Sequence, residues 1–369
     1  MKKLFQKTLS QLKSQNRYRS LSLPNGIDLT SNDYLGMTAH PNLRAAAIEA
    51  LQGGMDIGAA GSRLLRGHTK PHQDLEDFAA NHFGAGAALY FSSGFQANYA
   101  MLTTLPKRGD IILYDALVHA SMRDGLKAGD AKSFKFAHND LNVLEDLLKR
   151  HRDNAQTIWI AVESVYSMDG DCAPLAAVYD LAQKFDAMLI IDEAHGTGVF
   201  GEGGRGVAWD MIKAHGHDRI ITMHTCGKAI GVAGGLICAP VDVIDYMINA
   251  CRGFIYSTAP MPLQAYLVQK SLEILAGAEG DLRRRKLVDL SVQAKELFGG
   301  AGGHIVPIIL GEDERAMDVM HQMQERGFDI RAIRPPTVPA GTARLRLSLS
   351  SELSEDVLQN FADALKEVL

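Results

Sequence analysis

The stretch Ala187-Met188-Leu189-Ile190-Ile191-Asp192-Glu193-Ala194-His195 decides the fold class of this chain. Its first five residues are apolar throughout, which is typical of a β-strand that is covered on both faces. A carboxylate follows directly at Asp192, and an imidazole follows at His195. Strands of this kind form parallel sheets whose functional side chains gather at the carboxyl ends.

Further β-rich runs alternate with helical patterns from about residue 87 onward. The helical patterns include Asn142–His151 and Leu175–Phe185. This alternation predicts an α/β fold with a mostly parallel sheet. The predicted strands are Ala87–Ser92, Asp110–Tyr114, Ser133–Phe136, Thr157–Glu163, Ala187–Asp192, Ile220–Thr225 and Gly235–Ala239.

The pattern changes after Pro260-Met261-Pro262. One long helical pattern runs to about Leu297, and within it Arg283–Lys286 are expected to form a solvated charged face. The runs Ile305–Leu310 and Ala343–Leu349, with a helix between them, indicate a smaller α+β domain. We therefore predict an N-terminal helix and arm over 1–45, a large domain over 46–255 and a small domain over 256–369.

Charge and composition exclude several classes of protein. The 369 residues carry 38 Lys and Arg against 43 Asp and Glu, a net charge of −5, which argues against binding to nucleic acid or to an anionic membrane. No apolar run reaches the ~18 residues of a membrane span. The basic, amphipathic N-terminus is similar to a transit peptide, but we favour a first helix that packs on the body of the protein or on a partner subunit.

The four cysteines form no C-x-x-C pair, and no paired Cys/His spacing is present. We expect free thiols in a reducing compartment, hence a cytoplasmic protein, and we expect no metal site.

Two nucleotide-binding interpretations fail on their context. Gly196-Thr197-Gly198-Val199-Phe200-Gly201 matches G-x-G-x-x-G, but a glycine-rich loop follows it instead of a helix that could hold a pyrophosphate. Gly227-Lys228-Ala229 lacks the Ser/Thr and the upstream glycine of a P-loop. A glycine-rich active-site loop is the better interpretation of the first motif.

Polar groups follow several of the predicted strands. Ser92-Ser93-Gly94-Phe95 opens a helix, whose free N–H groups suit a phosphate, although a simple N-cap is an alternative. Asp192 and His195 follow one strand, and Lys228 follows the next at Thr225-Cys226-Gly227. A lysine at a strand end is placed for Schiff-base chemistry, although a surface lysine in a turn explains it equally well. His119 alone would be a structural histidine.

Together these groups indicate one site. A phosphate cradle, a carboxylate for a ring nitrogen, an imidazole to stack and a lysine to form an imine describe pyridoxal 5′-phosphate (PLP).

The motifs carry a family resemblance from about Arg17 to the C-terminus. The chain resembles the α-oxoamine synthases, which are fold-type I PLP-dependent transferases with a mostly parallel seven-stranded sheet in the large domain. The stretches that carry the resemblance are Thr30–Gly36, Gly61–Gly67, Ser167–Asp171, Asp192–Gly198 and Thr225–Lys228. Phe254–Thr258 and Ile333–Pro339 are similar to the member that serves biotin biosynthesis.

The resemblance implies a role for each matching residue. Lys228 would carry the cofactor and act as the base, Asp192 would pair with the pyridine nitrogen, and His119 would stack on the ring and act as the third catalytic residue. The other implied cofactor contacts are Gly94, Phe95, Ser167, His195, Thr225, Ser257 and Thr258, the last two across a homodimer interface. The implied substrate contacts are Asn32, Thr337, Arg346 and Arg17, with Arg19 as the alternative to Arg17.

The implied reaction is the decarboxylative condensation of L-alanine with a pimeloyl thioester, carried by coenzyme A or by a carrier protein (ACP). Three alternatives stay open. They are a sister synthase that uses glycine and another acyl-CoA, an aminotransferase on the same fold, and a non-catalytic subunit, against which Lys228 argues.

Overall fold

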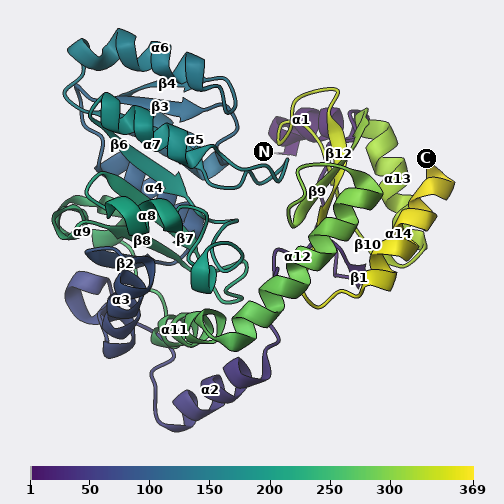
Figure 1. Cartoon of the computed structure of the whole chain (residues 1–369). Helices are drawn as coiled ribbons and strands as arrows, with labels where there is room; N and C mark the ends of the chain where they lie inside the picture. The colour runs from purple at the N-terminus through teal and green to yellow at the C-terminus, as the bar shows by residue number, and fades with distance from the viewer. Residues whose placement is uncertain (1) are drawn as a thin grey trace. The chain divides into compact units, whose positions relative to one another are not determined.

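The computed structural model describes the backbone of residues 2–369 and the side chains from Leu4 onward. It contains two compact units (Figure 1). The larger unit comprises residues 35–166 and 172–284, and the smaller unit comprises the residues up to Tyr34, residues 167–171 and residues 285–369. None of the described helices is long and apolar enough to cross a membrane.

The larger unit is built on a seven-stranded sheet of order β2-β8-β7-β6-β5-β3-β4. Only β8 runs antiparallel to its neighbours, so the carboxyl ends of the other strands lie at one edge of the sheet. The strands are β2 (Ala87–Phe91), β3 (Ile111–Asp115), β4 (Lys132–Phe136), β5 (Ile158–Glu163), β6 (Ala187–Asp192), β7 (Ile220–Thr225) and β8 (Gly235–Ala239). Each predicted strand is present with its ends within one residue of the prediction, and the predicted fold class is confirmed.

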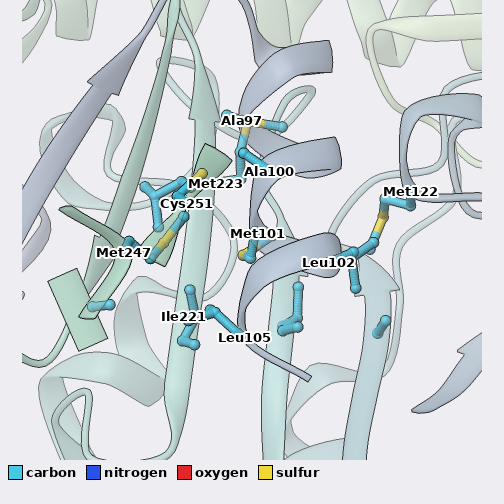
Figure 2. Packing of buried hydrophobic residues seen from close by; sticks show 14 of the residues in the cluster. Ala97, Ala100, Met101, Leu102, Leu105, Met122, Ile221, Met223, Met247 and Cys251 are labelled. Carbon is cyan, nitrogen blue, oxygen red and sulfur yellow. The ribbon is translucent and has the colours of Figure 1, made fainter. Parts of the chain in front are cut away.

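Helices cover both faces of this sheet. On one face, α4 (Gly94–Thr104), α5 (Ala120–Ala128), α9 (Val241–Ala250) and α10 (Arg252–Ile255) share a buried core with the strands. Figure 2 shows Ala97, Ala100 and Met101 of α4 packed beside Met223 of β7 and Met247 of α9. On the other face lie α6 (Leu141–His151), α7 (Leu175–Lys184) and α8 (Trp209–His215). Apolar strands are required where both faces of the sheet are covered, and only the edge strand β4 exposes polar residues, at Lys132, Ser133 and Lys135.

The remaining elements of the larger unit surround the sheet. They are α2 (Pro41–Gln52), α3 (Lys70–Phe83), α11 (Pro262–Ala276) and the short turns η1 (Arg63–Gly67), η2 (Arg152–Asn154) and η3 (Glu202–Gly204).

The smaller unit is an α+β arrangement. A three-stranded antiparallel sheet has the order β11-β12-β9, and β1 pairs in parallel with β10. Its elements are α1 (Lys2–Ser14), β1 (Ile27–Asp28), β9 (Ile305–Gly311), α13 (Asp313–Glu325), β10 (Phe328–Asp329), β11 (Ala332–Ile333), β12 (Ala343–Ser348) and α14 (Glu355–Val368). Helix α12 (Ala278–Phe298) begins in the larger unit and ends in the smaller one.

The compact units differ from the predicted domains in their boundaries. The smaller unit takes in residues 167–171, because Arg344 and Arg346 of β12 bind this segment. The long C-terminal helical pattern is two helices, because Gly277 adopts an extended conformation that ends α11.

The predicted solvated face of Arg283–Lys286 is wrong at Arg284. This side chain is buried, donates to the Gly198 carbonyl over 3.1 Å and pairs with Asp281. A run of four basic residues on a helix spans more than one face, so one of them had to point inward.

We expect the central strand to dominate the stability of the larger unit. Leu189 of β6 is fully buried, so Leu189→Ala should lower the free energy of unfolding by about 2–5 kcal/mol. Val241→Ala is the control, since Val241 is 53% exposed and should change stability by less than ~0.5 kcal/mol. Urea unfolding of both variants measures the difference, and equal losses would contradict this account of the core.

Candidate active site

A cavity of about 120 Å³ lies at the carboxyl edge of the large sheet. It belongs entirely to the larger unit. The lining residues that the sequence predicted are Gly94, Phe95, His119, Asp192, His195, Thr225 and Lys228. Parallel strand direction explains the gathering, because β3, β6 and β7 all end at this edge.

Lys228 lies in the loop that joins β7 to antiparallel β8. The loop is closed by backbone hydrogen bonds from Cys226 to Gly234 and from Val232 to Cys226, each 2.9 Å long. The Lys228 Nζ atom lies 2.7 Å from Nε2 of His195, which is itself buried. An amine so close to an imidazole is placed both to bond to an aldehyde and to exchange a proton.

Asp192 ends β6 and is only 2% exposed. Its Oδ1 accepts from the Ala194 N–H over 2.8 Å, and its Oδ2 accepts from Asn98 Nδ2 over 2.6 Å. Within residues 2–369 it forms no ion pair with a Lys or Arg side chain. A buried carboxylate without a cation is suited to hold a positively charged ligand atom.

His119 is the N-cap of α5. Its Nδ1 accepts from the Ser121 N–H over 3.2 Å and lies 2.8 Å from Ser121 Oγ. Burial lowers the pKa of His119, Asp192 opposes that shift, and Lys228 adds to it. The ring is therefore neutral at pH 7, with its proton on Nε2 because Nδ1 is an acceptor.

The start of α4 lies against β7 and β8 with no room for side chains. A Cβ atom on Gly94 would lie 2.8 Å from Thr225 Oγ1, and one on Gly235 would lie 2.8 Å from Gly94 Cα. The Ser93 hydroxyl caps the Gln96 N–H, and the other N–H groups of the first turn have no partner within the helix. This backbone cradle fits a phosphate group.

The donor set therefore fits PLP. The cradle suits its phosphate, Asp192 suits its ring nitrogen, and Lys228 suits its aldehyde.

Two buried glutamates at this edge are residues that the sequence reasoning missed. Glu163 ends β5 opposite Asp192 in the sheet register and lines the cavity. Glu193 accepts from Ser164 Oγ and the Ala208 N–H, each over 2.6 Å, and burial raises its pKa to about 7. The same signal that marked Asp192, a carboxylate at the end of an apolar strand, could have found both.

Asn98 and Ser121 also line the cavity and were missed. The signal for Asn98 is its place on α4, four residues after Gly94 and therefore on the same face of the helix.

A second polar cluster surrounds Arg346 in the smaller unit. Arg346 is 7% exposed; its Nε donates to the Ser167 carbonyl over 2.7 Å and its Nη1 donates to Ser348 Oγ over 2.6 Å. Both Nη atoms lie 3.2 Å from Asn32 Oδ1. The structure thus brings together the predicted residues Asn32, Ser167 and Arg346, and it adds Tyr34, whose hydroxyl donates to Asn32 Oδ1 over 2.9 Å. Burial raises the pKa of Tyr34 to about 12.

The remaining predicted residues lie elsewhere. Arg17 Nε binds Asp313 over 2.8 Å, whereas Arg19 Nη2 lies 3.4 Å from Thr337 Oγ1. Ser257 is half-buried and Thr258 is exposed, and neither lines the cavity of about 120 Å³. No group of His, Cys, Asp or Glu in the described part of the chain could hold a metal ion.

Comparisons with known proteins agree with this geometry. The family model for aminotransferase class I and II matches residues 24–365. An 8-amino-7-oxononanoate synthase of Herminiimonas arsenicoxydans is 39% identical over 357 residues, which cover 91% of each chain. One from Geobacter sulfurreducens is 38% identical and covers 98% of this chain and 96% of its own.

Solved structures give the same result. A serine palmitoyltransferase of Sphingomonas wittichii superposes with a TM-score of 0.86 at 32% identity, covering 93% of this chain and 87% of its own. The 8-amino-7-oxononanoate synthase of Francisella tularensis gives a TM-score of 0.77 at 28% identity, covering 93% of this chain and 98% of its own. A serine palmitoyltransferase of S. paucimobilis contains bound PLP.

These matches confirm the predicted fold type and the predicted cofactor, PLP. With this cavity at the edge of this sheet, the chain belongs to the aminotransferase class I and II family, among the α-oxoamine synthases that its motifs resemble.

Proposed function

We propose that this chain is a PLP-dependent acyltransferase that condenses L-alanine with a pimeloyl thioester and releases the thiol and CO₂. The carrying observation is the cavity itself, in which Lys228 Nζ lies 2.7 Å from His195 beside the buried Asp192. The relatives supply the product, 8-amino-7-oxononanoate. The carbon count agrees, since seven carbons from pimeloyl and three from alanine, less one as CO₂, make nine.

When bound, PLP supplies an electron sink for the electron pair released at the α-carbon of the amino acid. Asp192 holds the proton on the ring nitrogen, which keeps that sink positively charged. Lys228 would hold the cofactor through its aldehyde carbon, and its amine, when free, would be the base that takes the α-proton of L-alanine. His195 orients this amine. The neutral His119 ring would pack against the cofactor without adding a competing charge.

The carboxylate of the amino-acid substrate needs a cationic partner. We assign that carboxylate to Nη2 of Arg346, because Nε donates to the Ser167 carbonyl and Nη1 donates to Ser348 Oγ. Asn32 and Tyr34 fix the guanidinium plane from one side. For the distal carboxylate of pimeloyl, Arg17 is one candidate, but the contact between Arg19 and Thr337 favours Arg19.

A homodimer is part of this proposal. Ser257 and Thr258 lie outside the cavity, and the backbone pairing of Thr258 with Ser62 brings them near exposed Leu64 and Leu65. Ser257 and Thr258 would contact the cofactor phosphate of the second copy. The four free thiols, with Cys172 exposed, agree with a reducing compartment such as the cytoplasm.

Lys228 can be tested by trapping. Borohydride reduction of the yellow holoenzyme should fix the cofactor on the peptide that contains Lys228. Lys228→Ala should slow the chemical step by more than the ~10²–10⁴-fold expected for the loss of a simple general base, because the lysine also binds the cofactor. Lys213 of α8, whose side chain is 65% exposed, is the control, since Lys213→Ala should leave labelling unchanged. Labelling of another lysine would disprove the assignment.

The dimer can be tested by molar mass. Light scattering should give twice the 40.1 kDa of one chain, and Leu65→Glu should lower both the dimer fraction and the PLP affinity. Val143→Glu on α6 should change neither. A monomer with full activity at high dilution would refute the proposal.

Substrate choice separates this function from that of a glycine C-acetyltransferase. L-Alanine and glycine differ by one methyl group, so discrimination between them should be only ~10–200-fold. Pimeloyl-CoA or pimeloyl-ACP should be strongly preferred over acetyl-CoA, because acetyl leaves the carboxylate-binding groups unpaired. Arg19→Ala and Arg17→Ala, measured side by side, should show a raised pimeloyl KM in only one variant. If glycine and acetyl-CoA were the better pair, the acetyltransferase would replace the synthase.

A further inference from the structure

We infer that Asn98 is a positioning residue for the reaction, which holds the Asp192 carboxylate and connects it through Ser121 to the His119 ring. The inference rests on the proposed function in one respect, namely that Asp192 serves the cofactor ring. Asn98 and Ser121, the residues to which it gives a role, lie outside every family motif quoted above.

The connection is a continuous chain of four side chains. Asn98 Nδ2 donates to Asp192 Oδ2 over 2.6 Å and to Ser121 Oγ over 3.0 Å. Ser121 Oγ in turn lies 2.8 Å from His119 Nδ1. Asn98, Ser121 and Asp192 are each no more than 2% exposed, so water does not compete for these bonds.

The direction of every hydrogen bond in this chain is determined. The Asn98 amide must present its NH₂ group to Asp192, because a flipped amide would place two acceptor oxygens in contact. The second hydrogen of the NH₂ group goes to Ser121 Oγ. Ser121 then donates its own hydrogen to His119 Nδ1, which also accepts the Ser121 N–H. Asn98 therefore fixes the Asp192 carboxylate at one end and the His119 tautomer at the other.

The surroundings of the Asn98 carbonyl indicate that this side chain is present for its NH₂ group, which binds Asp192 and Ser121. Its Oδ1 is buried and has no hydrogen-bond partner among the described residues. A buried acceptor without a partner destabilises a fold, so the amide is not explained by stability.

The amide is also held rigidly. Its neighbours on α4, Ala97, Ala100 and Met101, are packed into the core beside β7 (Figure 2). Asp192 thus takes its orientation from a helix as well as from its own strand. A neutral donor also leaves the negative charge of the carboxylate available to the ring nitrogen, whereas a lysine or arginine at position 98 would neutralise it.

The test uses a partial reaction that needs no acyl substrate. The holoenzyme exchanges the α-hydrogen of L-alanine with D₂O, and NMR follows the exchange. Asn98→Ala should slow it by about 10- to 100-fold, the range for losing a hydrogen bond to a charged group, and should weaken PLP binding to the apoprotein in a fluorescence titration. Thr104→Val is the matched control, since Thr104 is a buried polar residue of the same helix, and it should change neither value.

A double-mutant cycle separates positioning from structural damage. If Asn98 acts through Asp192, Asn98→Ala should add little to the loss already caused by Asp192→Asn. Full additivity, or unchanged exchange and PLP affinity in Asn98→Ala, would overturn the inference. If Asn98→Ala does not fold, Asn98→Ser replaces it in the same cycle.

The substrate assignment fails separately from this inference. A wild-type enzyme that exchanges the α-hydrogen of glycine but not that of L-alanine would contradict the proposed function. The double-mutant cycle of Asn98 and Asp192 would then be measured with glycine as the substrate.

Discussion

The burial of one carboxylate, Asp192, is the constraint on which the site depends. At the end of an apolar strand and 2% exposed, this group cannot keep a charge by solvation. It is held by two neutral donors, the Ala194 N–H and the Asn98 amide. Neither donor neutralises it. A positively charged ring nitrogen would neutralise the Asp192 carboxylate. The burial that makes this charge unfavourable in the free protein therefore favours cofactor binding.

The neighbouring carboxyl of Glu193 shows a different solution to burial. Its pKa is raised to about 7, and its oxygens accept from Ser164 and from the Ala208 N–H. A Cβ on Gly196 would lie 2.0 Å from Glu193 Oε2, and one on Gly206 would lie 2.7 Å from its Cδ. Gly196, the first glycine of the G-x-G-x-x-G match, is therefore explained by close packing against Glu193, which fixes the loop after His195. The other two glycines of the match pack elsewhere, since a Cβ on Gly198 would lie 2.8 Å from Ala229 Cβ and one on Gly201 would lie 2.4 Å from the Gly206 carbonyl oxygen.

The large sheet could be predicted because most of its strands are apolar on both faces. Asp192 and Lys228 could be predicted because strand ends are the natural place for chemistry in such a sheet. Asn98 and Ser121 were missed because a polar residue inside a helix usually faces solvent, whereas the packing of α4 turns Asn98 inward. The burial of Arg284 escaped prediction for the same reason, since its carbonyl partner at Gly198 lies 86 residues away.

The reversed strand β8 explains where the lysine sits. Of the other catalytic groups in the cavity, Asp192 ends the parallel strand β6, and His119 lies on the loop that leads from the parallel strand β3 to α5. The β7–β8 connection instead returns at once to the sheet, and the hydrogen bonds of Cys226 to Gly234 and Val232 close it. A short closed loop restricts the backbone conformations available to Lys228. Its amine is therefore held close to His195 more firmly than a long, flexible loop would hold it. The antiparallel strand thus gives a precise position to the one side chain that must both form and break a covalent bond.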